Sequence, residues 1–110
     1  MPIAEQWNRG RRVNATMKVV LAKARAYYVV ETKNLSYGGV CLKSDQAFPS
    51  GTQLHLVFGQ PPDLPRLSLE GIVRWSEAGK GVGVEFTSLS AEDQQTLLEF
   101  VNSRYPGGQA

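Results

Sequence analysis

The chain of 110 residues is 42% hydrophobic and 20% charged, a composition that predicts one globular domain and excludes an extensively disordered chain. Its net charge of +2 is unevenly divided, because residues 1–33 carry seven basic and two acidic side chains whereas residues 34–110 carry five basic and eight acidic ones. No apolar run has the length of a signal peptide or of the ~20 residues that span a bilayer, so a cytoplasmic protein without membrane insertion is expected.

The first third of the chain predicts a basic arm followed by two strands. Residues 1–12 are polar and show no apolar periodicity, so they are expected to form a flexible arm. Residues 17–22 alternate in hydrophobicity, and residues 26–32 are rich in valine and tyrosine, which is typical of strands. A third strand is expected at 39–43, after a polar turn.

Three more strands are expected at 53–58, 67–76 and 81–86. In the second of these, Val73 and Trp75 are predicted to share the inner face, and Trp75 and Phe86 are interpreted as core residues rather than as a surface for stacking bases. Residues 59–65 are predicted to lie outside the strands, because their three prolines cannot donate ladder hydrogen bonds.

A helix closes the domain. Ser90 is a suitable N-cap, and Asp93 three residues later completes a capping-box pattern. The apolar face is expected to centre on Leu97, Leu98, Val101 and Tyr105, with Phe100 at its margin. The predicted fold is therefore mainly β: a six-stranded antiparallel β-barrel with a C-terminal α-helix, spanning residues 13–105 and followed by a disordered tail at 106–110.

The turn at residues 34–39 carries the most specific pattern in the chain. Asn34, Ser36 and Gly39 have the spacing [Asp/Asn]-x-Ser-x-x-Gly, which an ordinary turn does not require. This spacing resembles the signature of the PilZ family, small β-barrels many of which bind the second messenger cyclic di-GMP. Two later segments are similar to the same family: residues 71–75 match its G-x-V-x-W strand, and residues 81–86 match its G-x-G-V-x-F strand. The glycines in these strands are expected to permit the coiling that closes a barrel.

The sequence departs from the family pattern in the arm. Ligand-binding members carry R-x-x-x-R just before the first strand. Here Arg12 stands at the second arginine position, but Asn8 stands at the first. Arg9 and Arg11 are the other basic residues of this run, and neither restores the spacing.

The resemblance implies a ligand site made by the arm and the turn. Arg12, assisted by Arg9 and Arg11, would contact phosphate or guanine, since guanidinium groups bind both. Asn34 would meet a guanine edge and Ser36 would donate to a phosphate. Gly38 and Gly39 would allow the ligand to approach the backbone of the turn closely.

Other chemistry is not indicated. The single histidine, His55, is predicted to lie on the surface, and Cys41 is predicted to be a half-buried strand residue. Neither a metal-ligand spacing nor a catalytic triad is suggested, so no enzyme, no cofactor and no metal are expected. Nucleic-acid binding is disfavoured because the strands lack interleaved exposed aromatic and basic residues.

Two functions remain open. The first is a single-domain cyclic di-GMP receptor, a monomer or homodimer, that relays the signal to a protein partner through its arm and barrel. The second is a PilZ-like adaptor that does not bind the nucleotide and acts only by protein contacts, as in motility or type IV pilus regulation.

Overall fold

The structure, a computed structural model, describes residues 12–62 and 64–104. The described part holds seven strands and a helix, with these bounds: β1 (Val13–Asn14), β2 (Lys18–Lys23), β3 (Ala26–Leu35), β4 (Gly39–Lys43), β5 (Gln53–Gln60), β6 (Leu64–Glu77), β7 (Gly81–Ser88) and α2 (Ala91–Arg104).

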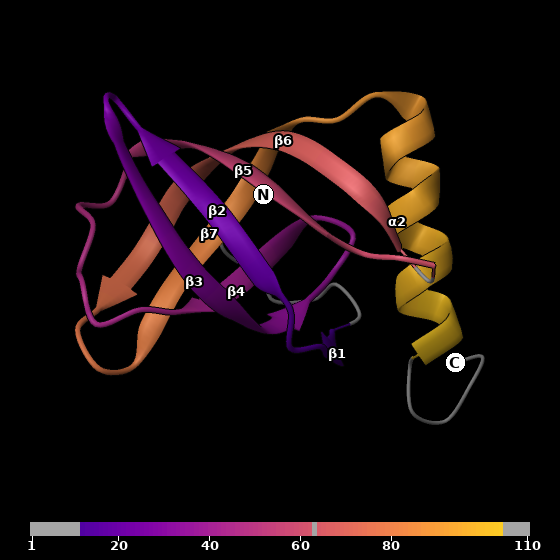
Figure 1. Ribbon diagram of the computed structural model, residues 1–110, viewed down its shortest axis with the longest axis horizontal. Helices are drawn as coiled ribbons and strands as arrows, with labels where there is room; N and C mark the ends of the chain where they lie inside the picture. The colour runs from indigo at the N-terminus through magenta and orange to yellow at the C-terminus, as the bar shows by residue number, and fades with distance from the viewer. Residues whose placement is uncertain (1–11, 63, 105–110) are drawn as a thin grey trace, which may run out of the picture.

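Six strands close into an antiparallel barrel, as the sequence predicts. Their order is β3-β2-β5-β6-β7-β4, and the ring closes because β4 also pairs with β3. The short β1 is an additional strand that pairs with residues 34–35 at the C-terminal end of β3. It continues along the edge of β3 at which β2 pairs with residues 26–31. Figure 1 shows the barrel with α2 standing against one end, where β6 and β5 approach it.

The core fills the inside of this barrel. Inward side chains alternate with outward ones along the strands, and many of the inward ones are fully buried. Among these are Val19, Leu21, Leu56, Val73 and Val84. Phe86 is 8% exposed and stacks on Phe58 with ring centroids 6.0 Å apart, which confirms it as a core residue.

The helix begins as predicted, and the Ser90 hydroxyl accepts the Asp93 N–H at 3.0 Å. Its buried residues are Leu97, Phe100 and Val101, so the prediction that Phe100 lies at the margin is wrong. Phe100 is 3% exposed, and the Arg104 guanidinium lies 4.6 Å from its ring centroid. The apolar face thus centres between Leu97 and Val101 rather than toward Leu98, which is only half-buried.

The proline-rich segment is also more regular than predicted. β5 continues to Gln60 and β6 already begins at Leu64, so Pro65 lies within a strand. A register shift between Phe58 and Gln60 makes this possible. At Gly59 a Cβ would lie 2.7 Å from the Arg66 Cα. The backbones of β5 and β6 therefore approach more closely here than a residue with a side chain would allow.

A β-bulge moves Trp75 to the outside of the barrel, which corrects its prediction as a core residue. Val73 faces Val84 across the β6–β7 ladder, but Trp75 faces Gly83, so Arg74 is an extra residue. The inserted residue reverses the alternation after the buried Val73. Trp75 is 37% exposed as a result.

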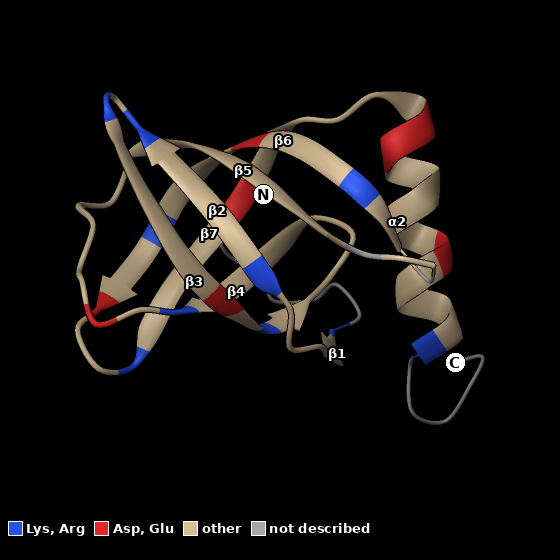
Figure 2. Ribbon diagram, in the orientation of Figure 1, with Lys and Arg blue, Asp and Glu red and all other residues tan. Residues whose placement is uncertain are grey.

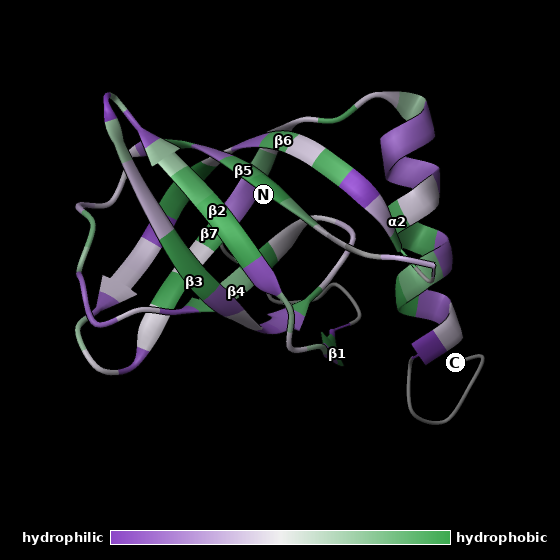
Figure 3. Ribbon diagram, viewed as in Figure 1, coloured by the Kyte–Doolittle hydropathy of each residue, from purple (hydrophilic) through white to green (hydrophobic). Residues whose placement is uncertain are grey.

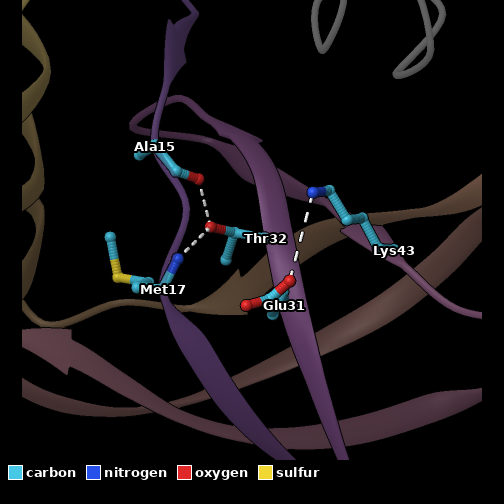
Figure 4. A network of polar contacts seen from close by, with 5 residues as sticks. All are labelled: Ala15, Met17, Glu31, Thr32 and Lys43. Carbon is cyan, nitrogen blue, oxygen red and sulfur yellow. Dashed lines mark hydrogen bonds and ion pairs between the residues drawn. The ribbon is translucent and has the colours of Figure 1, made fainter.

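Thr32 joins β1, β2 and β3 at the point where the chain passes from β1 into β2. Its hydroxyl is fully buried, accepts the Met17 N–H at 3.0 Å and donates to the Ala15 carbonyl (Figure 4). The Thr32 N–H in turn donates to the Met17 carbonyl at 2.9 Å. The Thr32 side chain therefore satisfies the Met17 N–H and the Ala15 carbonyl, which lie between β1 and β2 and have no ladder partners through these groups.

Thr32→Val is expected to lower the free energy of unfolding by about 1–3 kcal/mol, because valine fills the same volume but leaves the buried Met17 N–H unsatisfied. Urea unfolding measures this loss. Thr32→Ser keeps the hydroxyl and is the matched control, and it should lose clearly less. A Thr32→Val variant as stable as the unchanged chain would show that the hydroxyl does not stabilise this junction.

Candidate functional site

A second β-bulge shapes the surface beside the Asn34–Gly39 turn. Thr32 faces Leu42 across the β3–β4 ladder and Asn34 faces Cys41, so Lys33 is the extra residue. Because of this bulge, Lys33 and Asn34 both lie outside the barrel, whereas strict alternation would turn Asn34 inward. Leu35 is then fully buried. The bulge thus presents an ammonium and an amide next to each other on the outer surface.

Arg12 lies directly before β1 and reaches the same place. β1 pairs Val13 with Leu35 and Asn14 with Asn34, which holds the start of the described chain against the end of β3. The Arg12 Nη1 donates to the Asn34 Oδ1 at 2.6 Å. The arginine and the asparagine that the sequence assigns to one ligand site are therefore in direct contact.

The outward positions continue as a row across three further strands. The ladder pairs are Asn34 with Cys41, Cys41 with Gly83, and Gly83 with Trp75. Residues opposite each other in antiparallel strands share a face of the sheet. We call the outward set Arg12, Lys33, Asn34, Cys41, Gly83 and Trp75 the polar–aromatic row.

Gly83 is required where it stands because the Trp75 indole covers it. A Cβ at residue 83 would lie 2.0 Å from the Trp75 Nε1 and 2.6 Å from Cδ1. At Gly81, which has φ +139°, a Cβ would meet the Leu42 carbonyl oxygen at 2.8 Å and lie 3.6 Å from the Cys41 Sγ. The glycines of this strand thus make room for an indole lying against the barrel wall.

Burial shifts the pKa of two groups in the row, Arg12 and Cys41; Cys41 is 6% exposed, so it is buried rather than half-buried as predicted. Burial raises the pKa of the Cys41 thiol, and the nearby Lys33 and Arg12 charges offset part of this rise. Burial also lowers the pKa of the Arg12 guanidinium, and Cys41 offsets part of that change. Both effects indicate that the cations and the sulfur share one partly desolvated surface, where an added anion would interact strongly with Arg12.

The outward carboxylate opposite Gly39 is already paired. Glu85 faces Gly39 across the β4–β7 ladder, and its Oε1 accepts the Arg74 Nε–H at 2.6 Å. The Lys33 Nζ donates to a neutral group, the Lys80 carbonyl, at 3.3 Å. The electrostatics around the turn therefore favour an anion.

Ser36 organises the turn from inside. Its side chain is 1% exposed; the hydroxyl accepts the N–H groups of Gly38 at 3.3 Å and Gly39 at 3.1 Å, and donates to the Gly39 carbonyl at 3.2 Å. The hydroxyl is thus engaged within the turn. Its predicted donation to a phosphate stays a prediction, and it requires the hydroxyl proton to leave the Gly39 carbonyl.

Ser36→Ala is expected to lower the free energy of unfolding by about 1–3 kcal/mol, since it leaves the N–H groups of the buried Gly39 and the half-buried Gly38 without their acceptor. Urea unfolding measures the change. Ser44 makes a similar hydrogen bond to the Gln46 N–H in an exposed turn, where water replaces the lost partner. Ser44→Ala should therefore change stability by less than about 0.5 kcal/mol, and an equally small effect at Ser36 would contradict the structural role.

The predicted site residues are thus only partly assembled in the described chain. Arg12, Asn34, Ser36, Gly38 and Gly39 lie together. Arg9 and Arg11 lie outside the described residues, as does Asn8. A Cβ at Gly38 would meet nothing within 4 Å, so the turn is open to solvent there.

Sequence reasoning did not assign Lys33 to the site and predicted Trp75 as a core residue. Bulges bring Asn34 out beside Lys33 and turn Trp75 to the surface. Among residues 12–62 and 64–104, no group of three or more histidine, cysteine, aspartate or glutamate side chains could hold a metal ion. No helix in that same part of the chain is long and apolar enough to cross a bilayer.

Solved structures resemble this fold. The Bacillus subtilis inhibitor of motility MotI/DgrA matches with a TM-score of 0.74 and 24% identity, covering 87% of this chain and 49% of that one. The PilZ domain of CeSA from a cellulose-synthesizing bacterium matches with a TM-score of 0.63 and 19% identity, covering 82% and 93%. The Borreliella burgdorferi PlzA protein, solved in complex with c-di-GMP, matches with a TM-score of 0.61 and 16% identity, covering 90% and 44%.

The chain spans about half the length of the MotI/DgrA and PlzA chains that it matches. A search of the curated proteins found no match. The family comparison is direct, because the PilZ domain model matches residues 6–103 and so includes the second half of the arm, the barrel and nearly all of α2. With its closed barrel, its Asn34–Gly39 turn and Arg12 set against that turn, the chain belongs to the PilZ domain family.

Proposed function

We propose that the chain is a cyclic di-GMP receptor, without catalytic activity, that binds the messenger on the polar–aromatic row. The observation that carries this proposal is the 2.6 Å contact between Arg12 and Asn34, which brings the arm and the turn of the family signature to one point. Family membership supports it. A solved relative, PlzA, is in complex with this ligand.

Arg12 and Lys33 are the groups suited to the phosphates. The guanidinium now donates to a neutral amide oxygen, so a phosphate would replace a neutral acceptor by a charged one. Because Arg12 is half-buried and its guanidinium pKa is lowered by burial, the added negative charge also offsets a desolvation cost. Arg9 and Arg11 would close over the ligand from the arm.

Asn34 and Trp75 are suited to the bases. Once Arg12 turns toward a phosphate, the Asn34 amide is released and can pair with a guanine edge, which offers both acceptors and donors. The Trp75 indole presents a partly exposed flat face on the same row, and stacking on an aromatic side chain contributes about 1–3 kcal/mol per base. Binding would then order the arm and change the surface offered to a protein partner.

The competing function is an adaptor that acts by protein contacts alone. Two observations favour it: Asn8 occupies the first arginine position, and the Ser36 hydroxyl is engaged within the turn. Under this alternative the Arg12–Asn34 hydrogen bond only holds β1 against β3, and no ligand replaces it.

Calorimetric titration of cyclic di-GMP into the full chain separates the two functions. The receptor function predicts saturable heat, and Gly38→Leu should remove it while leaving stability unchanged, because the added side chain enters open space in the free protein. Cyclic AMP serves as the control ligand, since it offers one phosphate and no guanine. An absence of heat at messenger concentrations on the order of hundreds of micromolar would reject the receptor function.

A further inference from the structure

The outer face of the β2–β3 hairpin is apolar where a solvated strand face is ordinarily polar. Val20, Tyr27 and Val29 point out of the barrel and are 37%, 75% and 68% exposed. Val20 pairs with Val29 on one side and with the half-buried Val57 on the other, so three valines form a row across β3, β2 and β5. Figure 3 shows the hydrophobic middle parts of β2 and β3 lying side by side. We call Val20, Tyr27, Val29 and Val57 the hairpin patch.

The surface is hollowed beside this patch. A cavity of about 310 Å³ is lined by five residues: Lys18, Val29, Val30, Glu31 and Lys43. Two of these residues, Lys43 and Glu31, form an ion pair with Nζ and Oε1 4.0 Å apart and side chains 54% and 47% exposed. The contact is long and solvated, so its net contribution to stability is small and an incoming group can displace it.

The surroundings of the hairpin patch are mainly basic. Lys18 and Lys43 border it at one end, and Arg25 lies at the turn between β2 and β3 (Figure 2), whereas the Lys23 ammonium is directed to the other face, 5.9 Å from the Phe48 ring centroid. The neighbouring acidic groups are Glu31 and Glu70, and the Glu70 carboxylate is bonded to His55 at 3.1 Å. The local charge therefore favours carboxylates over further cations.

The mode of contact follows from the strand pairing. β2 pairs with β3 and β5, and β3 pairs with β2 and β4, so neither strand offers a free edge to an added strand. A partner must bind through side chains, and an amphipathic helix presents apolar side chains on one face with charges beside them. A second copy of this chain fits poorly, because the same basic border would meet itself.

We propose that the hairpin patch is the docking site for an acidic amphipathic helix of a protein partner. The apolar face of that helix covers Val20, Tyr27 and Val29, and one of its carboxylates enters the hollow between Lys18 and Lys43. This surface is separate from the polar–aromatic row, yet both lie on β3, where Glu31 and Lys33 are two residues apart. The proposal does not depend on nucleotide binding.

A random-peptide display library, selected on the full chain, tests this proposal. Peptides that are enriched should carry apolar residues at helical spacing flanked by aspartate or glutamate. The affinity of the best peptide should fall at least tenfold in Tyr27→Thr/Val29→Thr and in Lys18→Glu/Lys43→Glu. It should stay unchanged in Arg66→Ala, which removes an exposed cation elsewhere. The four residues substituted in the double variants are all exposed. Circular dichroism verifies that each variant is folded.

Several results would overturn the proposal. In the first, the unchanged chain enriches no peptide that the Tyr27→Thr/Val29→Thr variant does not also enrich. In the second, the enriched peptides are neutral or basic. In the third, the best peptide still binds both double variants. Co-sedimentation with vesicles of equal parts phosphatidylglycerol and phosphatidylcholine, lost in Tyr27→Thr/Val29→Thr, would assign the patch to a lipid surface instead. A dimer in sedimentation velocity that the same variant dissociates would assign it to a second copy.

Discussion

Gly83→Val is expected to lower the free energy of unfolding by about 2–4 kcal/mol, although valine is the better strand residue. A Cβ at this position would lie 2.0 Å from the Trp75 Nε1, so the indole must leave the barrel wall. The variant therefore loses the packing of a large aromatic side chain that is 37% exposed at present. Urea unfolding measures the loss.

The double variant Gly83→Val/Trp75→Ala isolates the cause. If the collision with the indole is responsible, adding valine to Trp75→Ala should cost nothing or stabilise the barrel, giving a coupling energy of a few kcal/mol in the double-mutant cycle. Losses that simply add would mean that glycine is needed at residue 83 for its backbone, and would contradict the contact with Trp75.

Arg12→Ala is expected to weaken cyclic di-GMP binding by roughly 10- to 150-fold. A hydrogen bond between charged groups contributes about 1.5–3 kcal/mol, and each 1.4 kcal/mol is a tenfold change in affinity. Arg12 is the described arginine that contacts the turn, since its Nη1 lies 2.6 Å from the Asn34 Oδ1. Calorimetric titration of the variant against the unchanged chain gives the ratio.

Arg66→Ala is the matched control for this prediction. It removes the same charge from an exposed position on β6, away from the turn. A loss of affinity confined to Arg12→Ala indicates a direct contact. Equal losses in both variants would attribute the effect to the overall charge of the chain, and the assigned role of Arg12 would be wrong.

Much of the fold follows from local sequence patterns. The strands, the Asn34–Gly39 turn, the Ser90 cap and the core position of Phe86 depend on alternation, turn residues and capping, all of which act over a few neighbouring residues. These features are present in the structure for the reasons that predicted them. The sequence predicts Gly83 within a strand. Its role in leaving space for the Trp75 indole depends on the neighbouring strand β6 and could not be read from its own strand.

The errors at the candidate site arise at bulges, whereas the error at Phe100 arises in the helix. An extra residue at Lys33 or Arg74 is defined only by the partner strand, and nothing in the local alternation of β3 or β6 marks it. Each bulge reverses the faces of the residues that follow, which brings Asn34 and Trp75 to the outside. The candidate site depends on these two reversals, so the family signature predicted its turn and its arginine but not its lysine or its indole.

Chemical-shift mapping by NMR tests the receptor function most directly, because it reports binding and its location together. Addition of cyclic di-GMP to the full chain should shift the amide signals of Gly38, Gly39 and Gly83 and the indole N–H signal of Trp75. Signals of the hairpin patch at Tyr27 and of α2 at Leu97 should change far less. Unchanged spectra at saturating messenger, or shifts centred away from the polar–aromatic row, would contradict this account.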